Sequence, residues 1–64
     1  MKISKHKVEL LMAKKQLSQK DLAADMGVAA SFVGGIIRRQ TAQPSTVGRL
    51  AAALGVPVEE LLEG

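Results

Sequence analysis

Residues able to perform acid–base, nucleophilic or redox chemistry are few in this sequence of 64 residues. It contains no cysteine, and His6 is its only histidine, within a lysine-rich segment. Asp21 and Asp25 stand four residues apart and would share one face of a helix, but no third metal ligand accompanies them. Ser18 has no base near it in the sequence and so lacks what activates a serine nucleophile. We therefore expect no enzyme activity, no catalytic residue, no metal, no cofactor and no small-molecule substrate.

The chemistry that remains is electrostatic. The net charge is +3 and the isoelectric point is about 9.7, values that permit binding to nucleic-acid phosphates without requiring it. Acidic residues gather near the end of the chain, at Glu59, Glu60 and Glu63. One end of the domain could thus face phosphates while the other avoids them, although such clusters are more often simply solvated. The basic residues are Lys2, Lys5, Lys7, Lys14, Lys15, Lys20, Arg38, Arg39 and Arg49.

Length and composition indicate one small domain over residues 1–64. No apolar run approaches the roughly 18 residues that a membrane span needs, and no signal-type apolar segment comes after the basic N-terminus. The lack of cysteine suits a reducing compartment. We expect a cytoplasmic domain that does not contact a membrane.

Apolar residues recur at helical spacing along most of the chain, and no segment alternates as a strand would. The expected helices cover residues 4–15, 18–27, 29–38 and 45–55, and a last short helix begins at 56–57. The expected core consists of Leu11, Leu22, Ala23, Val33, Ile36, Val47, Leu50 and Leu54. The fold class is therefore all-α.

The second of these helices has the clearest boundaries. Ser18 is a good N-cap residue, and Asp21 three positions later completes a short form of the capping box. Leu17 and Leu22 are spaced as a hydrophobic staple. Gly27 then predicts a left-handed residue that ends the helix. Ser45 is expected to cap the fourth helix in the same way as Ser18.

Several motifs occur together in one order along the chain. They are Leu17-Ser18-Gln19-x-x-Leu22-Ala23, Met26-Gly27-Val28, Pro44-Ser45-Thr46, Leu50-Ala51-x-x-Leu54-Gly55-Val56 and Glu60-Leu61-Leu62. With this spacing, nearly the whole chain resembles the Cro/C1-type (lambda repressor-like, XRE) helix-turn-helix family. The resemblance implies a compact five-helix domain with the helix-turn-helix at helices two and three. It also implies a homodimeric transcriptional regulator that binds double-stranded DNA.

The resemblance places the N-terminal half of helix three in the major groove. The residues that would then contact phosphates are Gln19, Lys20, Arg38, Arg39, Gln40 and Thr46. The residues that would face the bases are Ala29, Ala30, Ser31, Gly34 and Gly35. None of the latter can make the two-pronged contacts by which arginine or lysine reads guanine and asparagine or glutamine reads adenine. Base readout by helix three is therefore expected to be weak.

Helix three also suggests a different function. Gly34 and Gly35 each weaken a helix interior by roughly 0.8–1 kcal/mol relative to alanine, and the segment 26–37 carries no charge. An uncharged exposed patch on a small domain favours a protein contact. The alternative is a repurposed or engineered protein-interaction or self-assembly module on the same scaffold. Its interface on helix three would consist of Ala30, Phe32, Gly34, Gly35 and Ile37.

Overall fold

The computed structural model describes residues 1–63 of the chain. Within these residues the fold contains four α-helices and one short 3₁₀ helix, so the expected all-α class is confirmed. The elements are α1 (Lys5–Lys15), α2 (Gln19–Met26), α3 (Ala30–Arg39), α4 (Pro44–Leu54) and η1 (Val58–Glu60).

The expectation of five full helices was wrong, because the last element is a single 3₁₀ turn. The reason lies in the two leucines after Glu60. Leu61 is fully buried, and Leu62 forms an isolated antiparallel bridge with Ile3. The chain leaves the helical conformation to make these two contacts.

The predicted ends of the first two helices agree closely with the structure. Ser4 is the N-cap of α1 and accepts a hydrogen bond from the Lys7 backbone N–H at 3.2 Å. At the start of α2 the Asp21 N–H donates to Ser18 Oγ at 3.1 Å, and the Ser18 N–H donates to Asp21 Oδ2 at 2.9 Å. These reciprocal bonds form a complete capping box.

The starts of α3 and α4 differ from the sequence-based boundaries by one or two residues. Ala29 is the N-cap of α3 rather than its first helical residue. Gln43 is the N-cap of α4 and Pro44 occupies the first turn, so the expected cap at Ser45 was wrong. Proline suits that position because its φ is already helical and its missing N–H would be unpaired there anyway. Ser45 is thereby moved inside the helix, where it cannot act as the cap.

All the expected core residues except one are buried, and Leu11 is only half-buried against the core. The structure adds residues from the N-terminal segment, from each of the four α-helices and from the end of the described chain. The buried residues outside that expected core are Ile3, Val8, Met26, Ile37, Ala51 and Leu61.

The N-terminal segment is held in place by backbone pairing that the sequence did not reveal. The Ile3 N–H donates to the Gln40 carbonyl at 3.0 Å, and the Ser4 N–H donates to the Leu61 carbonyl at 2.7 Å. A second antiparallel bridge joins Lys2 to Thr41. The segment therefore connects the loop after α3 to the end of the described chain. Isolated bridges are too short to produce an alternating pattern.

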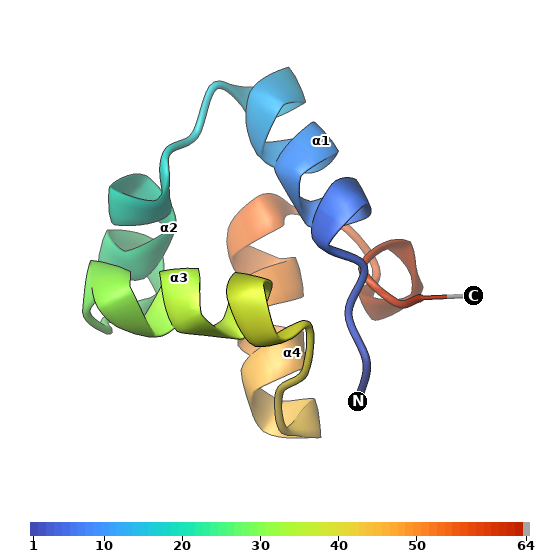
Figure 1. The fold of residues 1–64 in the computed structure, drawn as a ribbon. Helices are drawn as coiled ribbons and strands as arrows, with labels where there is room; N and C mark the ends of the chain where they lie inside the picture. Colours follow the sequence, from blue (N-terminus) through green and yellow to red (C-terminus); the bar gives the residue numbers. More distant parts are fainter. Residues whose placement is uncertain (64) are drawn as a thin grey trace.

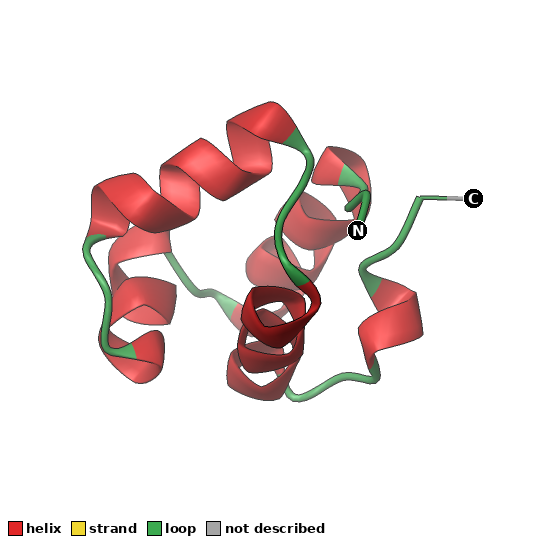
Figure 2. Cartoon of the chain, turned by 90° about the horizontal axis from the view of Figure 1, so that it is seen from below, coloured by secondary structure: helices red, strands yellow, loops and turns green. Residues whose placement is uncertain are grey.

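The helices are arranged with the α2–α3 pair at one end of the molecule and η1 at the other (Figure 1). Helix α4 packs against α2 and also against η1 and so joins the two ends. The view from below shows the same separation (Figure 2). The acidic residues of η1, Glu59 and Glu60, therefore lie at the end opposite to α2 and α3.

Candidate nucleic-acid interface

The turn between α2 and α3 sets the angle of the two helices. Gly27 has φ +71°, a left-handed conformation that glycine adopts without steric cost. The Val28 N–H then donates to the Ala23 carbonyl at 3.0 Å and closes the turn. Ala23 and Val33 are both buried where the two helices pack together. Because Val33 faces inward, the first turn of α3 is left projecting from the domain.

The expected base-facing residues do not share one environment. Ala29, Ala30 and Ser31 are exposed at the start of α3, as the sequence predicts. Gly34 is half-buried and Gly35 is buried. Gly35 is therefore not directly exposed, and the cause is its neighbours.

Both glycines of α3 are covered by long polar side chains. A Cβ atom added at Gly34 would lie 2.9 Å from Oε1 of Gln19. A Cβ atom added at Gly35 would lie 3.1 Å from Nη1 of Arg39 and 3.6 Å from its Cζ. The glutamine comes from the first turn of α2, and the arginine comes from the next turn of α3 itself. The glycines thus leave room for two side chains with strong hydrogen-bonding groups.

The expected phosphate-contacting residues are placed on both sides of α3. Gln19 and Lys20 are exposed in the first turn of α2. Thr46 is half-buried in the first turns of α4. Arg38, Arg39 and Gln40 are exposed at the C-terminal end of α3. Polar and basic groups therefore flank the projecting helix, as the backbone of a bound duplex would require.

A shallow groove runs along α3 on the side of α4. Its polar groups include the Arg39 guanidinium, the Thr46 hydroxyl and the Gln43 amide, while Phe32 contributes an apolar wall. The sequence did not single out Thr41, Ala42 or Gln43, because loop residues show no periodic pattern. The lining residues are Phe32, Ile36, Arg39, Thr41, Ala42, Gln43 and Thr46.

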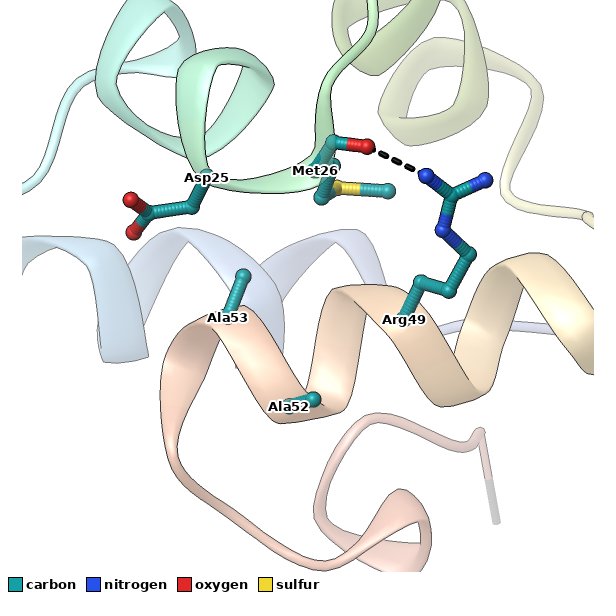
Figure 3. A pocket seen from close by; sticks show the side chains of 5 residues that line it. All are labelled: Asp25, Met26, Arg49, Ala52 and Ala53. Atoms are coloured by element: carbon teal, nitrogen blue, oxygen red, sulfur yellow. Dashed lines mark hydrogen bonds between the residues drawn. The ribbon is translucent and has the colours of Figure 1, made fainter.

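Arg49 belongs to a different part of the surface, where it has a structural role. Its guanidinium reaches from α4 and donates to the carbonyl of Met26, at the end of α2 (Figure 3). The groove around it is lined by Asp25, Ala52 and Ala53 as well. Cations stabilise helix C-termini, where carbonyl groups are unpaired. Arg49 therefore fixes α2 to α4, unlike the freely exposed Arg38.

Ile37 does not belong to the uncharged surface patch expected on α3. Ile37 is only 3% exposed and belongs to the core, so its assignment to an exposed interface was wrong. The cause is the helical period, which places Ile37 one turn from Val33 on the buried face. Phe32 is 43% exposed, but it borders a groove that also contains Arg39.

One titratable group near α3 has a shifted pKa. Hydrogen bonds from the Ser18 backbone and side chain lower the pKa of Asp21, with a smaller contribution from Lys20. Asp21 therefore stays negatively charged at the N-terminus of α2, where the helix dipole favours an anion.

Neither a cluster of metal-binding side chains nor a membrane-spanning helix occurs in residues 1–63. No group of histidine, cysteine or acidic side chains in them could hold a metal ion. No helix in the same residues has the length and apolar character needed to cross a bilayer.

Comparison with known proteins identifies the family. Searches of curated proteins and of solved structures each found no match. A family model described as helix-turn-helix matches residues 8–61, most of the chain. That match begins within α1 and ends after η1, so it includes the α2–α3 turn and the flanking helices. The chain belongs to the Cro/C1-type helix-turn-helix family of DNA-binding domains.

Proposed function

We propose that this domain is a transcriptional regulator that places α3 in the major groove of double-stranded DNA. The observation that carries the proposal is the position of the polar groups around α3. Gln19 lies against Gly34 on one side, and the groove with Thr46 runs along the other. A duplex backbone on either side of an inserted helix would meet these groups.

Charge supports the same orientation. Lys20, Arg38 and Arg39 are exposed on α2 and α3, whereas Glu59 and Glu60 belong to η1, which lies on the other side of the molecule from α2 (Figure 1). A duplex approaching α3 would avoid the acidic residues. Phosphate contacts would supply most of the affinity, with Gln19, Lys20, Arg38, Gln40 and Thr46 as the contacting residues.

The first turn of α3 is expected to discriminate only weakly between bases. Ala30 can contact a thymine methyl group, and Ser31 can make one hydrogen bond. Neither can form a two-pronged contact with a purine. Binding would therefore depend strongly on salt and weakly on most positions of the DNA sequence.

A homodimer would present two copies of α3 to half-sites about one helical turn apart. Pairing through α4 and η1 would leave both copies of α3 free. Light scattering of the protein bound to a duplex with two half-sites would give the stoichiometry, and a single protein per duplex would contradict the dimer.

A salt titration tests the DNA-binding proposal. Binding to an arbitrary fluorescent duplex would be measured by anisotropy from about 50 to 200 mM salt, where phosphate contacts lose affinity steeply. Arg38→Ala should weaken binding to every duplex and reduce the slope of log affinity against log salt by about 1.

Lys14→Ala is the matched control, because it removes one positive charge from α1, beside Glu60 rather than beside α3. It should leave the slope unchanged. Failure of the unmodified protein to bind any duplex at about 50 mM salt would overturn the proposed function.

A further inference from the structure

Gly35 lies on the side of α3 that faces away from the core. Val33 and Ile37 point inward, and at 100° per residue Gly35 lies opposite both of them. A residue on that side would normally be exposed, yet Gly35 is buried. The Arg39 side chain covers it, with Nη1 3.1 Å from the position that a Cβ would occupy.

The position of Arg39 is a consequence of helix geometry. Residues four apart are neighbours on a helix surface, and long side chains point back toward the N-terminus. The guanidinium of Arg39 therefore lies about one turn before its own Cα. Because Gly35 has no side chain, the planar group can lie directly on the helix backbone, near the centre of the outward face.

We propose that Arg39 is a base-reading residue that recognises a guanine in the major groove, in place of the phosphate contact expected from its sequence position. This inference rests on the proposed function, in which the outward face of α3 enters that groove. The guanidinium presents paired N–H donors to the O6 and N7 acceptors of guanine, the commonest specific contact in protein–DNA complexes. The four-residue spacing within α3 places these donors over Gly35, on a face where the helix itself offers only Ser31 and bare backbone.

Arg38 provides the internal comparison. It has the same charge and is also exposed, but at 100° per residue it lies about 60° from Gly35, on the side away from Arg39. No glycine of α3 has Arg38 among its nearest neighbours. Arg38 is thus expected to contact a phosphate, and Arg39 a base.

Selection from a duplex library with randomised positions tests this difference. The unmodified protein should enrich guanine at one or more positions of each half-site. Arg39→Ala and Arg39→Lys should lose that enrichment, and discrimination between guanine and adenine at the position should fall by about 10-fold. The lysine variant keeps the charge but loses the planar two-pronged donor. Arg38→Ala should weaken binding to all sequences and keep the guanine preference.

Gly35→Leu provides a second test that leaves Arg39 in the sequence. Leucine favours helix, and its side chain would occupy the space above Gly35 and displace the guanidinium. The variant should fold, as circular dichroism would show, and should lose the guanine preference while still binding duplex DNA.

The outcomes separate this inference from the proposed function. Duplex binding with no guanine enrichment, or with the same enrichment in Arg39→Ala or Gly35→Leu, would overturn the role of Arg39 alone. An absence of duplex binding by the unmodified protein would overturn the proposed function and the role of Arg39 together.

Discussion

The two helices of the helix-turn-helix differ in where their stability comes from. Helix α2 begins at a complete capping box between Ser18 and Asp21 and ends at the left-handed Gly27. Helix α3 has no side-chain cap at Ala29, contains two interior glycines and ends at a left-handed residue, Gln40, that is not glycine. Local interactions define α2, whereas α3 depends on the elements that pack against it.

This difference matches the roles of the two helices. Helix α2 buries Leu22, Ala23 and Met26 and is attached to α4 through Arg49, so it acts as a fixed support. Helix α3 keeps its inward face in the core and leaves a nearly bare outward face, on which the side chains of Gln19 and Arg39 lie. A reading surface can thus be assembled from residues outside the positions that usually provide it.

Ile37 should give the largest effect. If burial holds α3 in place, Ile37→Ala should lower the free energy of unfolding by about 2–5 kcal/mol, as other large-to-small core changes do. Phe32→Ala, on the exposed face of the same helix, should cost about 1 kcal/mol or less. Denaturant titration would measure both. Equal costs for the two variants would show that Ile37 is not a core residue.

The capping box of α2 should give a smaller effect. Ser18→Ala should destabilise the domain by about 1 kcal/mol, because the Asp21 N–H loses its acceptor. Ser45→Ala is the matched control, since Ser45 lies inside α4 and should change stability by no more than about 0.5 kcal/mol. Thermal unfolding of both variants would compare them. A larger loss in Ser45→Ala than in Ser18→Ala would restore Ser45 as a cap.

Replacing glycines within helices should give an effect of opposite sign. Gly48→Ala in α4 meets no atom within 4 Å and should stabilise the domain by about 0.5–1 kcal/mol. Gly34→Ala should gain less, because its Cβ would displace the amide of Gln19. In a Gln19→Ala background the two glycine replacements should stabilise the domain equally. A double-mutant cycle of unfolding free energies would measure this. A difference that persists would mean that Gln19 does not rest on Gly34.

Lowering the pH should produce the smallest change in stability, and this change should come from the capping box of α2. The pKa of Asp21 in the folded protein is below its ordinary value of 3.8. Its stabilising contribution is therefore present above that value and is lost as the pH falls through the folded-state pKa. Asp21→Asn should lower the melting temperature at neutral pH, and the gap to the unmodified protein should close once the pH has fallen below the folded-state pKa of Asp21. A gap that is constant with pH would rule out the charged capping interaction.

The sequence by itself determined the features of this protein that depend on neighbouring residues. The cap at Ser18, the left-handed turn at Gly27 and the inward faces of α2 and α4 could all be predicted, because each depends on contacts within about four positions. The order of the motifs was enough to indicate the helix-turn-helix family.

Only the tertiary structure decided the features that depend on residues brought together by folding. The pairing of Ile3 with Gln40 and Leu62 spans most of the chain, and it reduces the expected last helix to a single turn. Gln19 lies over Gly34 because α2 and α3 pack together. The sequence shows that the base-facing positions of α3 have short side chains, but only the folded structure shows that a side chain from α2 covers one of them.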